Sequence, residues 1–342
     1  MTSPQKIQQY HKIIWASEPM QEIYQTIIQV ANSNATILIT GETGTGKELC
    51  AHAIHQESQR RDKPYVIFNC AATNHNLMES ELFGHVKGAF TGAECKRAGA
   101  ASKANGGTLF LDEIGELDWK LQRKLLRFIE TNRFHKLGAD KLESVDIRIL
   151  CATNRHLPTE IKAGRFREDL YYRLATVIMP LPPLRDRGDD VLLLAQKFLE
   201  KYSLQSQKKF GGFVWGAEKF LSSYKWPGNV RQLMSCIQNL VLLNDDGKKV
   251  TSEMLIAALG NDTSCLADIT TSLSQSTKSS QKLIPNVAIL NSNNTLRTLE
   301  EIKKDVILAA IRHCDGNVMK AAGELGMGYA TVYRRLREWK VS

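Results

Sequence analysis

The sequence predicts an α/β domain with a parallel sheet, followed by a helical lid subdomain and a small all-α domain. Short apolar runs alternate with helical patterns from about residue 13 to residue 184, an order typical of α/β folds. Strand patterns then stop, and apolar residues recur at helical spacing up to about residue 259. A last helical region begins near Thr298, after a long polar stretch.

Four apolar runs are expected to form the strands of the sheet. Each is four or five residues long and nearly continuous, which suits parallel strands that helices cover on both faces. The runs occupy residues 36–40, 65–68, 108–111 and 147–150.

The remaining segments set the expected domain boundaries. Helices are predicted at 191–201, 217–224 and 230–242. Between 261 and 294, Ser, Thr, Asn and Gln fill 18 of 34 positions and no aromatic residue occurs, which predicts a flexible linker. The expected order is an N-terminal extension (1–12), the α/β part (13–184), the lid (185–260), the linker (261–296) and the all-α domain (297–342).

Composition excludes several classes of protein. The 342 residues are 43% hydrophobic and 24% charged, as in ordinary globular proteins, and no apolar run approaches the ~18–20 residues of a membrane span. The chain starts with polar residues and shows no secretory signal. Its seven cysteines are scattered without CxxC spacing, which argues against zinc or redox motifs and fits a cytoplasmic protein. A net charge of +9 indicates a polyanionic partner, and charge alone does not choose between nucleic acid, a nucleotide and an acidic membrane. The leading hypothesis given below expects no membrane partner.

The first apolar run leads directly into a glycine-rich loop and then a helical pattern. Glycines let backbone N–H groups turn toward phosphates, and a helix N-terminus adds positive potential. Lys47 is expected to reach the β- and γ-phosphates of a nucleotide, although Glu48 stands where a Ser or Thr is usual. The loop consists of Gly41, Glu42, Thr43, Gly44, Thr45, Gly46, Lys47 and Glu48.

The third apolar run ends in two acidic residues, Asp112 and Glu113. Asp112 is expected to hold Mg²⁺, and Glu113 to polarise the water that attacks the γ-phosphate. Alone, the two acids could instead cap the helix that follows. Beside a phosphate loop, they favour nucleotide hydrolysis.

A third motif is the hexapeptide Gly88, Ala89, Phe90, Thr91, Gly92 and Ala93. With the nucleotide motifs, it resembles the bacterial enhancer-binding activators of sigma-54 RNA polymerase. The resemblance covers about residues 13–259 and the last 45 or so, and it implies an AAA+ P-loop NTPase core that uses ATP and Mg²⁺. It also implies that the hexapeptide is the surface loop that engages sigma-54, whereas local sequence alone would bury Phe90 in a core.

Further residues take roles that this resemblance implies. Asn69 aligns with the asparagine that hydrogen-bonds the catalytic glutamate, and Asn154 aligns with the residue that senses the γ-phosphate. Arg167 and Arg173 align with arginine fingers offered to a neighbouring subunit, which requires a ring-shaped homo-oligomer. Arg231 aligns with the lid arginine that points back at the nucleotide.

The last three helical patterns, at 299–313, 318–325 and 329–339, resemble a Fis-type helix-turn-helix with a glycine turn at 326–328. Such a domain places its last helix in the major groove of DNA. Leu325, Val332 and Leu336 are expected in its core. The residues expected to meet DNA are Tyr329, Thr331, Tyr333, Arg334, Arg335 and Arg337.

Val86 and the segment 314–318 are most similar to the LuxO-type branch of the family. Those regulators carry an N-terminal receiver domain, which is expected to be absent from this chain. Between Arg155 and Arg187, 7 basic residues face 4 acidic ones, and this segment is expected to serve a neighbour's ATP.

The leading hypothesis is an ATP-dependent activator of sigma-54 RNA polymerase that binds upstream DNA, as dimers that assemble into a hexameric ring. Three alternatives stay open. The chain could be a DNA-binding repressor whose ATPase domain is only a scaffold, a different AAA+ machine, or an unregulated truncated relative.

Overall fold

The computed structural model divides the chain into two compact units, Met1–Asn261 and Asp262–Ser342. The structure describes residues 8–10, 13–72, 75–260, 298–313 and 329–339, together with 318, 322 and 327. The linker predicted at 261–296 lies outside the described residues. So do Leu325 and most of the helix predicted at 318–325.

The first unit is built on a five-stranded parallel sheet with the order β11-β3-β10-β7-β4. The four predicted strands are present, and an unpredicted fifth strand, β11, forms one edge. The strands are β3 (Ile37–Thr40), β4 (Tyr65–Asn69), β7 (Thr108–Asp112), β10 (Arg148–Thr153) and β11 (Val177–Pro180).

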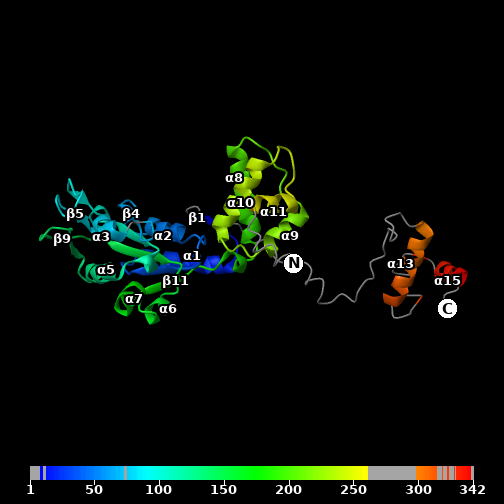
Figure 1. Cartoon of the computed structure of the whole chain (residues 1–342), viewed down its shortest axis with the longest axis horizontal. Coiled ribbons are helices and arrows are strands. Elements are labelled where there is room, and N and C mark those ends of the chain that lie inside the picture. The colour runs from blue at the N-terminus through cyan, green and yellow to red at the C-terminus, as the bar shows by residue number, and fades with distance from the viewer. Residues whose placement is uncertain are drawn as a thin grey trace. The chain divides into compact units, whose positions relative to one another are not determined.

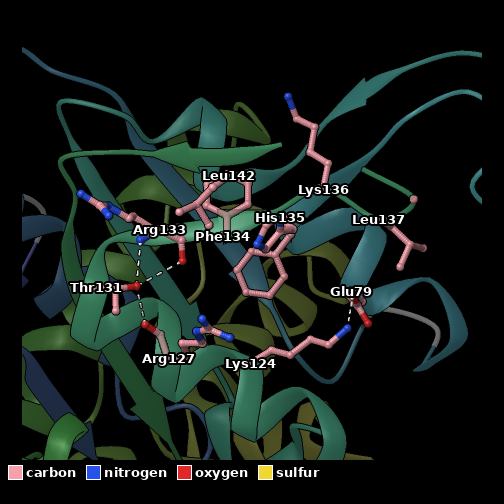
Figure 2. Close-up of a pocket in the computed structure, with 12 residues that line it drawn as sticks. Glu79, Lys124, Arg127, Thr131, Arg133, Phe134, His135, Lys136, Leu137 and Leu142 are labelled. Carbon is pink, nitrogen blue, oxygen red and sulfur yellow. Dashed lines mark hydrogen bonds and ion pairs between the residues drawn. The ribbon is translucent and has the colours of Figure 1, made fainter. Parts of the chain in front are cut away.

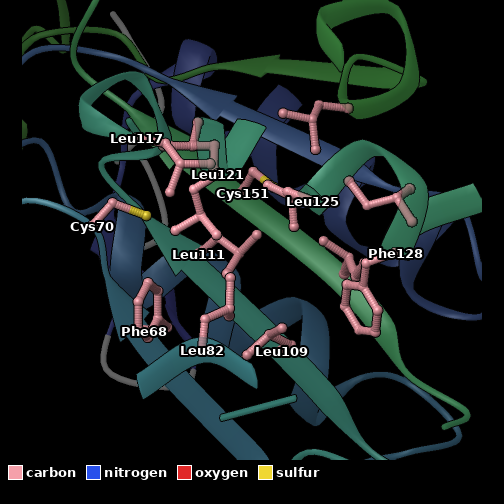
Figure 3. Packing of buried hydrophobic residues seen from close by; sticks show 14 of the residues in the cluster. Phe68, Cys70, Leu82, Leu109, Leu111, Leu117, Leu121, Leu125, Phe128 and Cys151 are labelled. Atoms are coloured by element: carbon pink, nitrogen blue, oxygen red, sulfur yellow. The ribbon is translucent and has the colours of Figure 1, made fainter. Parts of the chain in front are cut away.

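Helices cover both faces of this sheet (Figure 1), as its nearly continuous apolar strands require. Side chains alternate along each strand, so Ile37 and Ile39 pack under α1 (Glu18–Ala31) and α2 (Lys47–Gln56) on one face. Leu109 and Leu111 face the other layer, as Figure 3 shows. That layer contains α3 (His75–Phe83), α4 (Ala100–Lys103), α5 (Trp119–Thr131) and α7 (Glu168–Leu174).

Short elements project beyond this core. Two antiparallel pairs, β5 (Gly84–His85) with β6 (Arg97–Ala98) and β8 (Arg133–His135) with β9 (Leu142–Ser144), lie at one end of the unit in Figure 1. The others are β1 (Gln8–Tyr10), β2 (Ile13–Trp15), η1 (Ile114–Glu116), α6 (Leu157–Lys162) and η2 (Leu184–Asp186).

The lid helices gather at the other end of the same unit (Figure 1). They are α8 (Asp190–Gln205), α9 (Trp215–Ser223), α10 (Asn229–Leu243) and α11 (Ser252–Leu259), the last of which was not predicted. Asp190, which is 1% exposed, ties the start of α8 to the segment after β2. Its Oδ1 accepts from the amides of Ala16 (2.6 Å) and Ser17 (2.9 Å), and its Oδ2 accepts from the Ser17 hydroxyl (2.7 Å).

The second unit contains α13 (Leu299–His313) and α15 (Tyr329–Glu338), as predicted. Ile307, Ala322 and Val332 are buried together, and Leu336 and Trp339 pack against them. Within the described ranges, no helix of either unit is both long and apolar enough to span a bilayer.

The aromatic cluster under α5 provides a test of the packing. Phe128 is 1% exposed and meets Phe83 and Phe134 at ring-centroid distances of 5.5 and 5.6 Å. We expect Phe128→Ala to lower the unfolding free energy by about 3–5 kcal/mol, because it removes buried area and leaves a cavity. The control is Arg123→Ala, at an exposed site on the same helix, with a change below about 0.5 kcal/mol. Equal stabilities in urea titrations would contradict this packing.

Candidate functional site

The predicted polar residues meet at the carboxyl edge of the sheet. Parallel pairing sets Asn69 opposite Asp112 and Thr153 opposite Thr40, so the residues that follow these strands share one edge. The loop after β3, the acids after β7 and Asn154 after β10 therefore come together as the sequence predicts. Ligands of open α/β sheets bind at this edge.

The glycine loop lines a cavity of about 350 Å³. Gly46 precedes α2 with φ of 102°, a left-handed conformation that favours glycine. Gly44 has φ of 81°, and a Cβ there would lie 2.3 Å from the carbonyl oxygen of Gly228 in the lid. Glycine is thus required both by the turn of the loop and by the close approach of the lid.

Lys47 is 7% exposed at the floor of this cavity. Its Nζ donates to the carbonyls of Gly41 (2.9 Å) and Glu42 (3.3 Å) and lies 3.8 Å from Glu113 Oε1. Burial lowers the pKa of the amine, although the nearby carboxylates oppose this shift. A desolvated ammonium whose carboxylate partner is this distant is suited to bind a polyanion.

The two acids differ in their surroundings. Burial raises the pKa of Asp112, whose Oδ1 accepts from the Glu113 amide at 3.0 Å. Glu113 has φ of 51°, which turns its side chain toward Lys47 and toward the backbone amide of Asn154, whose hydrogen it accepts at 3.1 Å. The Asn154 side chain donates to Thr43 Oγ1 at 3.0 Å, so the three predicted segments are linked.

Asn69 differs from its predicted contact. Its Nδ2 donates to Asp112 Oδ2 at 3.3 Å, where the sequence predicted a bond to Glu113. The register is the reason, because Asn69 and Asp112 are paired residues of β4 and β7. The backbone turn at Glu113 directs that side chain away from β4.

The lid supplies a contact that the sequence analysis missed. Asn229, at the start of α10, is fully buried, and its Nδ2 donates to Glu42 Oε2 and to the Thr43 carbonyl, both at 3.1 Å. Its Oδ1 accepts from the Leu184 amide at 2.8 Å. One side chain therefore fastens the phosphate loop, the start of the lid and α10 together. Asn229 has φ of 51°, a left-handed conformation that Asn tolerates. Nothing in the sequence around Asn229 revealed this role.

Two arginines at the start of the lid also contact the loop. Arg185 forms a bidentate pair with Glu42 (2.9 and 2.6 Å), and buried Arg187 donates to the Thr45 carbonyl at 2.7 Å. The hydrogen bonds from Arg185 and then Asn229 lower the pKa of Glu42 to about 2. The expectation that this segment serves a neighbour's nucleotide is therefore wrong for these two arginines, which hold the chain's own loop.

The other wall of the cavity comes from the lid and α1. Arg231 lines it, as predicted, and its amide donates to the Gly44 carbonyl at 3.3 Å. The apolar part of the wall consists of Met20, Leu194, Phe198, Val230 and Met234. The cavity thus has a polar side that carries both cations and carboxylates, and an apolar side.

The hexapeptide forms a closed turn at the end of the unit that carries β5. The Gly88 amide donates to the Ala93 carbonyl at 2.8 Å, and Thr91 and Gly92 are exposed. Phe90 is half-buried and meets the ring of His85 edge-on at 5.1 Å. The aromatic side chain is therefore neither in the main core nor fully exposed, and the loop tip is presented outward.

Comparison with known proteins gives three consecutive family matches. Residues 13–179 match the Sigma-54 interaction domain, residues 185–271 match the AAA+ ATPase lid domain, and residues 298–339 match the Fis family of bacterial regulatory proteins. Together they cover both units.

Among curated relatives, the regulatory protein LuxO of Vibrio vulnificus is 48% identical over 97% of this chain and 70% of LuxO. ZraR of Escherichia coli is 41% identical over 95% of this chain and 68% of ZraR. The chain belongs to the sigma-54-dependent transcriptional regulators. The resemblance to the LuxO-type branch is thereby confirmed, as is the AAA+ P-loop core with its lid and helix-turn-helix.

A solved structure supports the same assignment. NtrX from Brucella abortus, crystallised in complex with ATP, aligns with a TM-score of 0.66 and 30% identity, over 96% of this chain and 69% of NtrX. An ADP complex of the same protein aligns with a TM-score of 0.67.

The two arginines that this family suggests as fingers do not line the cavity of their own subunit. Arg167 pairs with Asp169 (3.0 and 2.5 Å) and stacks on Trp119, with its guanidinium carbon 5.5 Å from the ring centroid. Arg173 is exposed and has no ion pair with any residue that the structure describes. Arg173 is thus the freer of the two.

The residues predicted to meet DNA are only partly described. Arg334 is exposed on α15 and Thr331 is half-buried, while the side chains of Tyr329, Tyr333 and Arg337 lie outside the described residues. Arg335 pairs with Glu300 of α13 at 2.9 Å. It therefore links the two helices within its unit, and its contact with DNA stays a prediction.

The Glu42 contact predicts a dependence on pH. Because its pKa is lowered on folding, Glu42 contributes stability above its ordinary pKa of 4.5, and this is lost as pH falls toward about 2. Glu42→Gln should therefore destabilise the chain at pH 7, by no more than about 1 kcal/mol because the pair is partly exposed. The difference from the parent should shrink between pH 4.5 and 2. Urea titrations at both ends of this range measure it, and a constant difference would contradict the contact.

Proposed function

We propose that this regulator binds and hydrolyses ATP in a ring of identical subunits and uses the energy to activate sigma-54 RNA polymerase. The observation that carries the proposal is that one compact unit holds both a nucleotide-type cavity at one end of its sheet and the Gly88–Ala93 turn, with its exposed tip, beyond the other.

ATP would bind with its phosphates at the glycine loop and its base at the apolar wall of the cavity. The backbone of the Gly41–Lys47 loop and the buried Lys47 ammonium suit the β- and γ-phosphates, and Arg231 adds positive charge on the lid side. The apolar wall of Met20, Phe198 and Met234 suits the base. The complexes of NtrX with ATP and ADP support this reading by similarity.

Asp112 suits a divalent cation. Its carboxylate is desolvated by burial, which raises its pKa, and a bound cation would stabilise the charged form. Lys47 and Glu113 lie beside it. Mg²⁺ bound here would neutralise charge on the phosphates. Asn69 would hold the Asp112 carboxylate in place.

Glu113 is the proposed general base. Its carboxylate is oriented by the Asn154 amide, and Asn154 in turn bonds Thr43 of the phosphate loop. A displacement of the phosphate loop would therefore reach the base through two hydrogen bonds. Glu113 would take the proton of the attacking water, and an arginine of the adjacent subunit would stabilise the charge on the γ-phosphoryl group.

The output would be mechanical. Asn229 and Arg231 of the lid contact Thr43 and Gly44 of the phosphate loop. A change of the bound nucleotide would therefore move the lid against the core. The Gly88–Ala93 turn would then act on sigma-54 while the Fis domain holds upstream double-stranded DNA in the cytoplasm.

Mixed rings test whether a site is shared between subunits. Lys47→Ala should abolish ATP hydrolysis by removing the phosphate ligand, and Arg173→Ala should abolish it by removing the finger. In a 1:1 mixture, roughly a quarter of the interfaces would pair an intact Lys47 with an intact Arg173 of the neighbour. We expect ATPase activity to return in the mixture. No recovery, in mixtures shown by native mass spectrometry to exchange subunits, would place the finger elsewhere. The same mixture with Arg167→Ala shows which arginine is used.

The role of the turn is tested separately from ATP. Thr91→Ala should keep ATPase activity and lose open-complex formation with sigma-54 RNA polymerase in vitro, because Thr91 lies at the exposed tip. Cys95→Ala, an exposed site just beyond the hexapeptide, is the matched control and should retain both activities. Normal open-complex formation by Thr91→Ala would refute the assignment.

A further inference from the structure

A second cavity of about 480 Å³ lies away from the nucleotide site, between α3, α5 and the β8–β9 hairpin (Figure 2). Its size is that of a small-molecule site. Phe83 and Phe134, 2% and 5% exposed, form an aromatic base, and Leu142 contributes an apolar side chain that is 46% exposed.

The rim of this cavity is basic. Lys124, Arg127 and Arg133 line it, with Lys136 at one side and Glu79 as the acidic lining residue. Figure 2 shows these side chains around Phe134 and His135.

Two of the basic groups already have acidic partners. Lys124 pairs with Glu79 at 2.5 Å, and Lys136 pairs with Glu143 of the facing strand at 2.6 Å. The Lys136 contact holds the pKa of Glu143 below its usual range, so this carboxyl group is ionised at neutral pH.

Arg127 and Arg133 differ, since neither forms an ion pair with any part of the chain that the structure describes. Thr131 fixes the backbone between them, because its hydroxyl donates to the Arg127 carbonyl (2.7 Å) and accepts from the Arg133 amide (3.2 Å). The backbones that carry these two arginines are thus fixed beside the cavity, and their guanidinium groups are available for a carboxylate, phosphate or sulfonate.

We propose that this cavity binds a small organic anion with an aromatic or apolar body. The anionic group would bond Arg127 and Arg133, and the apolar body would cover Phe134 and Leu142. Arg127 and Arg133 beside the 46% exposed Leu142 favour such a ligand over inorganic phosphate, which would leave that apolar side chain in water.

The cavity lies next to the segment that carries the Gly88–Ala93 turn. Leu137 and Gly138 line it, and the Leu137 carbonyl accepts from the Val86 amide at 3.1 Å. A Cβ on Gly138 would lie 2.9 Å from the Ala89 side chain. A ligand would therefore stiffen the hairpin that supports the Gly88–Ala93 turn. An effect of this ligand on sigma-54 rests on the proposed function, whereas binding of the ligand to the second cavity does not.

The test is a fluorescence titration of the full chain with 8-anilinonaphthalene-1-sulfonate, an anion with two aromatic parts. We expect saturable binding whose Kd rises at least about tenfold in the double variant Arg127→Gln/Arg133→Gln. The matched control, Lys120→Gln/Arg123→Gln, removes the same charge from exposed positions of α5 outside the cavity and should leave the Kd unchanged. Leu142→Ser keeps the charge and should weaken binding several-fold.

Three outcomes would overturn the proposal: no saturable binding, equal Kd values in the Arg127/Arg133 variant and the control, or binding of an acidic peptide through these arginines without binding of the probe. The last outcome would make the cavity a protein-docking surface. The single variants Arg127→Gln and Arg133→Gln serve if the double variant does not fold. ATPase activity of every variant, measured in parallel, separates failure of this proposal from failure of the nucleotide site.

Discussion

The parallel register of the central sheet is the constraint on which the rest of the structure depends. It aligns the ends of β3, β4, β7 and β10, so residues more than a hundred positions apart in the chain meet at one edge. A shift of one residue would turn Asp112 away from Asn69 and exchange the two apolar layers. The burial of Ile37 and Ile39 on one face, and of Leu109 and Leu111 on the other, therefore also positions the polar site.

The site itself combines desolvated charges with backbone partners. Lys47 is held by carbonyls and Arg187 by the Thr45 carbonyl, while Asn229 joins the loop to the lid. These contacts hold the basic groups in place without an ion pair to Lys47 shorter than 3.8 Å, which leaves the Lys47 ammonium available for a polyanion. The same logic distinguishes the second cavity, where Lys124 and Lys136 are neutralised by carboxylates but Arg127 and Arg133 are not.

Much of the fold and site could be predicted because the signals are local. Continuous apolar runs revealed four strands, and glycine spacing with an adjacent strand revealed the phosphate loop. The edge strand β11 escaped because its apolar run has only three residues before Pro180, and Ile178 among them is exposed. Asn229 and the partner of Asn69 could not be found, since their roles arise from contacts across 187 and 43 positions of the chain. The ion pair of Arg335 with Glu300 also could not be predicted, because the two residues lie 35 positions apart in the chain.

The Asp190 carboxylate has a consequence for how the molecule transmits motion. Three hydrogen bonds join Ala16 and Ser17, the residues that follow β2, to the first turn of α8. The segment that precedes α1 and the first lid helix are thus linked directly. A movement of the lid would therefore displace residues 13–17. A movement of those residues would displace the lid in turn, since such coupling is reciprocal.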